Sequence, residues 1–205
     1  ISKKVADKLA ELHKADFEDY KAKWQNMSIF VKYGMLSDDK FYDRAKKICL
    51  LQNTEKEYSS IEDYIAKIEP NQTDKDGTFV VLYASDQDAQ HSYIQAAKEK
   101  GYEVLLLDSP IVAHLMQKLE TTKEKVHFAR IDTDPIDKLI KKTDDTISKL
   151  SDEQKDTLKS KIEAVVASKE YTVQMEAMDS SAAPFMITEP EFMRRMKEMQ
   201  QTGGG

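Results

Sequence analysis

Residues 78–84 read Thr-Phe-Val-Val-Leu-Tyr-Ala, an almost unbroken run of strand-forming side chains. β-branched and aromatic residues favour strands, and a run without polar alternation is typical of a strand covered on both faces, as in a parallel sheet. Residues 102–107 (YEVLLL) and 126–131 (VHFARI) have the same character. The sequence therefore predicts three neighbouring buried strands.

Helical patterns separate these strands. Asp86 is placed to cap a helix over residues 86–100, and Gly101 to end it in the left-handed conformation. A second helix is predicted over residues 108–119, with Pro110 at a tolerated first-turn position. The order β-α-β-α-β within about 55 residues predicts a small three-layer α/β lobe with a short parallel sheet and right-handed crossovers.

The preceding part of the chain, residues 1–70, is predicted to be a helical segment. Asp16 can cap its second helix, because a carboxylate accepts hydrogen bonds from the free amides of a first turn. Residues 29–34 (IFVKYG) are predicted to be a short apolar connection closed by glycine, and Ser37 to open the next helix. Ser60, with an acid three residues later, resembles a capping box and predicts a further helix start.

The composition becomes polar from residue 143 on, which predicts a domain boundary and a third part over residues 143–205. Ser151 is expected to cap a helix, and residues 171–175 (YTVQM) alternate like a half-buried strand. This part is therefore predicted to be α+β, after the α/β lobe. The inner face of the helix that Ser151 caps is expected to consist of Leu158, Ile162, Val165 and Val166.

Composition excludes several classes of function. The net charge is −6, and the largest basic cluster is residues 138–142, so no face suits nucleic acid. The apolar runs, such as residues 104–107, are too short to cross a bilayer, so no membrane partner is expected. Cys49 is the only cysteine, which excludes an internal disulfide, and its apolar position predicts a core thiol in a reducing cytosol.

Catalytic chemistry finds little support. The four histidines are scattered, and no glycine-rich turn follows residue 84 to hold a phosphate group. Asp86 and Asp108 follow the first two strands, and two carboxylates there could hold Mg²⁺, although both are also good helix caps. We therefore expect no catalytic residue, metal or cofactor in this chain, and keep a Mg-dependent α/β enzyme as a rival interpretation.

The last helix has an unusual composition. Six of the nine methionines lie between residues 175 and 199, and Phe192, Met196 and Met199 are spaced i, i+4 and i+7 with Met193 beside them. Unbranched thioether side chains repack easily, so methionine-rich surfaces suit proteins that bind many partners. The alternative is that these side chains form a buried stripe in a structural scaffold, which would bind no other protein through them.

Six segments together resemble the ninety-kilodalton heat-shock chaperone family, in its bacterial branch. They occur in the family's order over nearly the whole chain. The segments are residues 23–39 (KWQNMSIFVKYGMLSDD), 60–64 (SIEDY), 78–86 (TFVVLYASD), 101–107 (GYEVLLL), 109–111 (SPI) and 191–199 (EFMRRMKEM).

The resemblance implies which parts are present. Residues 1–70 would be the helical end of the large middle-domain lobe and residues 71–142 the small α/β lobe. Residues 143–205 would be a C-terminal domain cut before its dimerisation helices. The N-terminal ATPase domain, with its ATP and Mg, would lie outside the chain.

The resemblance also implies a function. The segment would bind non-native client proteins in the cytoplasm, within a homodimer that meets co-chaperones and runs an ATP cycle elsewhere. The client-binding residues would be Phe192, Met193, Met196 and Met199. His114, on the helix after the second strand, and Trp24 are further candidate client contacts, although this chain lacks the acids and tryptophan that the family often has around His114.

Overall fold

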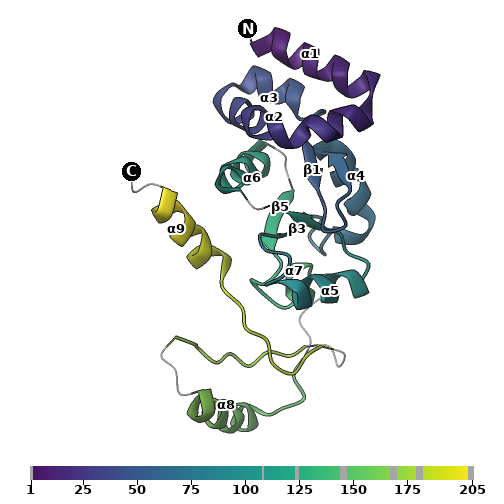
Figure 1. The fold of residues 1–205 in the computed structure, drawn as a ribbon. Coiled ribbons are helices and arrows are strands. Elements are labelled where there is room, and N and C mark those ends of the chain that lie inside the picture. The colour runs from purple at the N-terminus through teal and green to yellow at the C-terminus, as the bar shows by residue number, and fades with distance from the viewer. Residues whose placement is uncertain are drawn as a thin grey trace. The chain divides into compact units, whose positions relative to one another are not determined.

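The computed structural model describes residues 2–107, 109–122, 125–143, 147–166, 170–178 and 182–202 (Figure 1). Two compact units are present: Ile1–Lys142 together with Ile187–Gly205, and Thr143–Met186. The first unit contains, in order, α1 (Ser2–Ala15), α2 (Phe17–Ser37), α3 (Asp39–Ala45), β1 (Leu50–Gln52), β2 (Tyr58–Ser60), α4 (Ile61–Gln72), β3 (Phe79–Ala84), α5 (His91–Glu99), β4 (Val104–Leu106), α6 (Pro110–Thr122), β5 (Val126–Arg130), α7 (Ile136–Leu139) and α9 (Glu191–Thr202).

The three predicted strands form one parallel sheet in the order β4-β3-β5. Leu82 of the central strand pairs with Val104 on one side and with Ala129 on the other. The prediction of a short parallel sheet is therefore confirmed. Its central strand is buried almost throughout, as an unbroken apolar run requires.

Alternate side chains of β3 enter two cores. Val80 and Leu82 pack with residues of α5 and β5 and with Ile140, which directly follows α7, while Val81 and Tyr83 pack with residues of α4 and α6. Helices thus lie on both faces of the sheet, and the lobe has the three layers that the sequence predicts.

The N-terminal helices share the second of these cores. Tyr20, Trp24 and Met35 of α2 are buried in the same cluster as Val81 and Phe128 of the sheet. Because one hydrophobic cluster runs from the helices into the sheet, residues 1–142 form a single compact unit.

Cys49 is fully buried in this core, as predicted. Burial raises the pKa of its thiol to about 12, since the thiolate has no access to water there. The hydroxyl of Tyr20 donates to the carbonyl of Ile48, the residue before it, at 2.9 Å.

Helix α2 continues through residues 29–34, so the predicted connection there is wrong. Gly34 does not end the helix. Instead it lets α3 approach, because a Cβ at this position would lie 2.9 Å from Cε1 of Phe41. The next helix is capped by Asp38, whose carboxylate accepts from the amides of Lys40 and Phe41, one residue later than the predicted cap at Ser37.

Other local predictions are confirmed. Asp16 accepts from the amide of Asp19 at the start of α2, and Ser60 accepts from the amide of Asp63 at the start of α4. Gly101 has a positive φ of +75° after α5. Asp86 caps a turn rather than the helix itself, which begins at His91.

The sequence does not predict the antiparallel hairpin of β1 and β2, whose strands have only three residues each. Its loop contacts strand β4. The amide of Thr54 donates to the carbonyl of Val104 at 2.9 Å, and the side chain of Asn53 donates to Glu57 and Glu103. The hairpin thereby occupies the β4 side of the sheet.

The second unit contains α8 (Asp152–Val166). Ser151 caps it reciprocally with Gln154, as a capping box does. None of the described residues between 143 and 186 is buried, so the expectation that the apolar face of this helix lies inside is wrong for Leu158, Val165 and Val166.

The predicted strand at residues 171–175 is also wrong, because these residues lie in no strand. A strand is stabilised by hydrogen bonds to a neighbour. No strand is found in the described part of this unit that could supply them.

Candidate protein-binding site on the last helix

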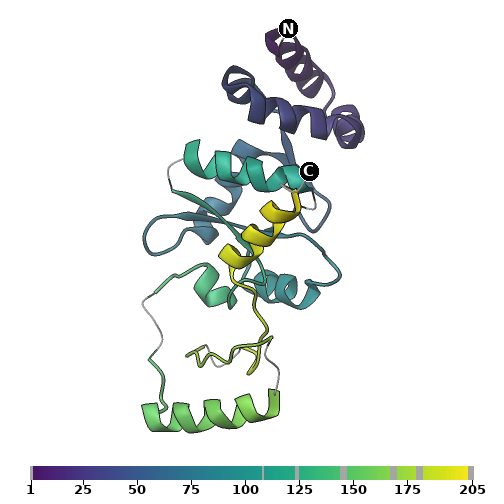
Figure 2. The ribbon, with the colours of Figure 1, turned by 90° about the vertical axis from the view of Figure 1, so that its left-hand side faces the viewer.

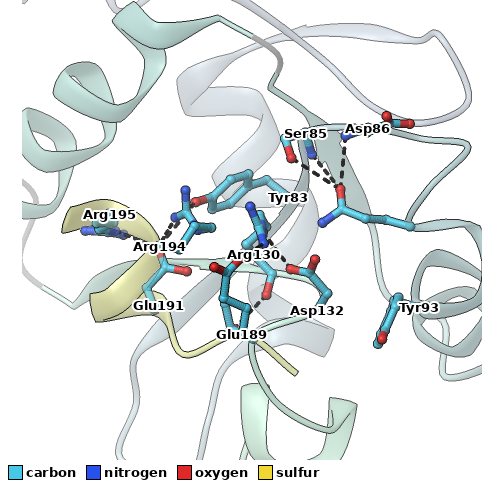
Figure 3. Close-up of polar contacts among 12 residues, drawn as sticks. Tyr83, Ser85, Asp86, Tyr93, Arg130, Asp132, Glu189, Glu191, Arg194 and Arg195 are labelled. Atoms are coloured by element: carbon cyan, nitrogen blue, oxygen red, sulfur yellow. Dashed lines mark hydrogen bonds and ion pairs between the residues drawn. The ribbon is translucent and has the colours of Figure 1, made fainter. Parts of the chain in front are cut away.

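The segment before α9 crosses the sheet at the carboxyl ends of its strands. The hydroxyl of Tyr93 donates to the carbonyl of Ile187 at 2.5 Å, and the amide of Glu189 donates to the carbonyl of Asp132 at 3.2 Å. Arg130, at the end of β5, donates to the carboxylates of both Asp132 and Glu189 (Figure 3). These contacts place the start of α9 beside the α/β lobe.

The polar face of α9 is turned toward the lobe. Arg194 is only 3% exposed, and its guanidinium donates to the hydroxyl of Tyr83 and to the carboxylate of Glu191. The same guanidinium lies 5.5 Å from the centre of the Tyr83 ring. Tyr83 itself donates to Glu191 at 3.3 Å, so β3 and α9 are joined by a closed set of polar contacts (Figure 3).

Arg195 makes a second connection, to α6 and β5. It contacts the carboxylate of Glu120 at 3.2 Å and donates to the carbonyl of Phe128 at 3.1 Å and to Glu191 at 2.5 Å. Glu120 also accepts from the amide of Phe128 at 2.7 Å and lies 3.2 Å from Nδ1 of His127. Figures 1 and 2 both show α9 next to α6, in agreement with these contacts.

The electrostatics of Glu120 reflect this environment. Burial by itself would raise the pKa of its carboxyl, but hydrogen bonds from His127, Arg195 and the Phe128 amide outweigh burial and lower it to about 2. Glu189 also has a lowered pKa, chiefly through its hydrogen bond to Lys197. We call the set Tyr83, Glu120, Glu191, Arg194 and Arg195 the α9 anchor.

The opposite face of α9 is exposed and apolar. Phe192 is 74% exposed, Met193 56% and Met196 40%. The helix therefore turns Glu191, Arg194 and Arg195 toward the lobe and its apolar residues toward solvent, the reverse of an ordinary surface helix. We call Phe192, Met193 and Met196 the apolar face of α9; the side chain of Met199 lies outside the described residues.

The other two candidate client contacts differ in accessibility. Trp24 is 3% exposed in the core of the first unit, so a client could reach it only after that core opens. His114 is exposed on α6. Neither of them lies in the α9 anchor.

The residues of the rival magnesium site are only partly described. Asp86 accepts from the amides of Asp88 and Ala89, and its own amide donates to Gln90 (Figure 3). Asp108 lies outside the described residues. Across the described ranges, no group of three or more histidine, cysteine or acidic side chains is arranged to hold a metal ion.

Sequence reasoning missed the α9 anchor. The pattern of the last helix places its arginines opposite its methionines but does not show that the arginine side is buried. The available signal was the spacing of Glu191, Arg194 and Arg195 at i, i+3 and i+4, which puts all three on one helix face. Their partners Tyr83 and Glu120 lie more than 70 residues earlier, and no local pattern links them.

The described helices include none that is both long and apolar enough to span a membrane.

Comparison with known proteins places the chain among chaperones. The family model described as "Hsp90 protein" matches residues 1–202. The chaperone protein HtpG of Porphyromonas gingivalis is 41% identical over 208 residues, covering 100% of this chain and 30% of that protein. HtpG of Bacteroides thetaiotaomicron is 39% identical with the same coverage. The chain thus spans about 30% of the length of these curated relatives.

A solved structure shares the fold. The middle domain of a heat shock protein from Plasmodium falciparum matches with a TM-score of 0.51 at 16% identity, covering 64% of this chain and 55% of that one. At this identity the likeness concerns the fold alone.

Proposed function

Since this chain belongs to the Hsp90 family of chaperones, we propose that it forms a client-binding part of a longer protein and takes up apolar segments of non-native proteins on α9. The observation that carries the proposal is the outward orientation of Phe192, Met193 and Met196 on a helix whose opposite side holds the buried Arg194. Apolar burial drives such contacts.

The anchoring of α9 supports binding over a purely structural role. A scaffold helix would turn its apolar residues into its own core, whereas here Arg194 occupies the buried side. Full burial of a Phe or Met side chain contributes about 1.5–3 kcal/mol. Three partly exposed side chains of this kind offer enough surface for weak, reversible contact with many different sequences.

The remainder of the proposed activity belongs to the longer protein. ATP and Mg would bind in a part that this chain does not include, and the ATP cycle would control client release. A cytoplasmic homodimer that meets co-chaperones is the expected assembly. Within this chain we propose binding residues only, with no catalytic role for Asp86.

The test replaces the apolar face of α9 by serine, in this chain and in the longer protein. Phe192→Ser, Met193→Ser and Met196→Ser together should weaken binding of heat-unfolded citrate synthase at least tenfold, because the apolar area is lost. Suppression of its aggregation should fall in parallel, and the melting temperature should change little, since these side chains are exposed.

A matched control is available on α2, where three apolar residues are similarly exposed. Serine at Ile29, Phe30 and Tyr33 removes a comparable apolar surface outside α9. Binding should survive in this control. Equal loss in both variants would indicate general surface hydrophobicity instead of a site on α9, and no loss in either would refute the proposal.

A further inference from the structure

We propose that α9 is a detachable helix, held on the α/β lobe by the α9 anchor and switching between a docked and a released state. The docked state fixes where the apolar face of α9 is presented. A regulatory role for this switch in client binding rests on the proposed function. Docking of α9 on the lobe does not depend on that function.

The first argument is the nature of the contact. The buried side of α9 consists of Glu191, Arg194 and Arg195, so docking gains little from apolar burial. The ion pair of Arg195 with Glu120 is partly exposed and stabilises only weakly. For the buried Arg194, the cost of desolvating the guanidinium offsets much of the attraction that it gains. A helix held in this way is expected to dock marginally and reversibly.

The second argument is that the site on the lobe that binds α9 is held in place by contacts within the lobe itself. Glu120 is oriented by the Phe128 amide and by His127, both of which belong to the lobe and not to α9. The carbonyl of Phe128 lies beside it and accepts from Arg195. A carboxylate and a carbonyl are therefore positioned for one guanidinium, and α9 can return to the same place after release.

The third argument is chain connectivity. Residues 143–186 form a separate compact unit between the lobe and residue 187. The cost of closing a loop grows only slowly with its length, so a tether of this size allows release without preventing return. Besides the α9 anchor, the contact of Ile187 with Tyr93 of α5 and that of Glu189 with Arg130 of β5 hold this segment.

Release of α9 should consequently change which of its side chains are accessible to other molecules. In the docked state the lobe covers Arg194 and partly covers Glu191 and Arg195, while Phe192, Met193 and Met196 face solvent. In the released state both sides are accessible, and the position of the apolar face no longer follows the lobe. Glu120 and Arg195 are positioning residues for the helix in this scheme.

Hydrogen exchange of the intact chain, read by mass spectrometry, tests the proposal. Raising NaCl from 50 mM to 1 M should speed exchange of α9 amides about tenfold while β3 and β5 keep their protection, because salt favours separated charges. Glu120→Gln and Arg195→Gln should each speed α9 exchange at low salt. The double variant should exchange no faster than the faster single variant, since both remove the same contact.

The decisive comparison is salt dependence in the double variant, which should be largely lost. Lys155→Gln, which removes the exposed pair with Asp152 on α8, is the matched control and should leave α9 exchange unchanged. The proposal is overturned if α9 exchange in the wild type does not respond to salt, or if the two substitutions act additively and the salt response persists.

These experiments test the detachable helix and the proposed client binding separately, so that either proposal can be refuted without the other. The serine variant of the apolar face should leave the salt response of α9 intact, because those side chains do not belong to the anchor. A chain with a normal salt response but unchanged client binding in the serine variant would contradict only the proposed function. The reverse pattern would contradict only the detachable helix.

Discussion

Gly34 lies inside α2, four residues before its C-cap Asp38, and an alanine inside a helix ordinarily improves it by about 0.5–1 kcal/mol. Contact with Phe41 reverses this effect. A methyl group there would meet the ring of Phe41, which is buried and cannot swing away. Crowding of a packed core costs about 1–3 kcal/mol, so the clash exceeds the gain in helix propensity.

We therefore expect Gly34→Ala to lower the free energy of unfolding by about 1–2 kcal/mol in denaturant titrations followed by circular dichroism. Asn26→Ala, at an exposed position of the same helix, supplies the propensity change without the clash and should leave stability equal or slightly higher. A more stable Gly34→Ala chain would show that the helices separate easily.

Whether the role of a single residue could be predicted from the sequence depends on how far along the chain its partner lies. Asp16, Ser60 and Gly101 act on amides or backbone angles within a few residues, and their roles could be predicted. The role of Gly34 depends on a ring seven residues away in another helix. Arg194 depends on Tyr83, 111 residues earlier, and no periodicity encodes that contact.

Among the elements, the three strands of the parallel sheet were the most predictable, because a buried parallel strand is a continuous apolar run such as β3. Helix α2 was divided wrongly, since a glycine after an apolar stretch is also typical of a helix end. For α9 the amphipathic pattern was evident, but pattern alone does not say which side is buried. Partners on the lobe decide this.

The docking of α9 should depend on pH in a defined window. The pKa of Glu120 is about 2 in the folded chain, below its ordinary value near 4.5, because the hydrogen bonds to its carboxylate outweigh its burial. Of these hydrogen bonds, only the one from Arg195 is supplied by α9, whereas His127 and the Phe128 amide belong to the lobe in both states. The contact of Arg195 with ionised Glu120 therefore stabilises the docked form above pH about 4.5, and this contribution disappears as the pH falls toward 2.

Exchange of α9 amides, corrected for the intrinsic effect of pH, should therefore accelerate relative to β3 between pH about 4.5 and 2.5. His127 and Arg195 face Glu120, and the guanidinium of Arg195 stays cationic throughout this window, so in the contact between Arg195 and Glu120 it is Glu120 that titrates. The variant Glu120→Gln should show a flatter profile. An unchanged profile in that variant would assign the pH response to Glu189, whose pKa is also lowered.

Across the whole molecule, stability is distributed unevenly. The first unit has two hydrophobic cores, whereas no described residue of Thr143–Met186 is buried. Segments with few buried apolar contacts open at low free-energy cost. The unit around α8 is thus the part most readily unfolded locally.

Brief digestion with thermolysin should cut first between residues 143 and 186, where Ile147 and Val165 are exposed. Phe30 and Tyr33 are the internal control, because they are similarly exposed but lie on α2, which is packed into the first core. Cleavage should reach α2 only later. A first cut at Phe30 would mean that exposure alone, and not local stability, determines the order.

Strand β5 forms an outer margin of the sheet, and an unprotected margin is a template on which a foreign strand can add. Here the amide and the carbonyl of Phe128 are occupied by the side chains of Glu120 and Arg195. Two helices thereby supply the hydrogen bonds that a neighbouring strand would otherwise offer. A strand from another molecule therefore finds no free backbone group at Phe128 to which it could add.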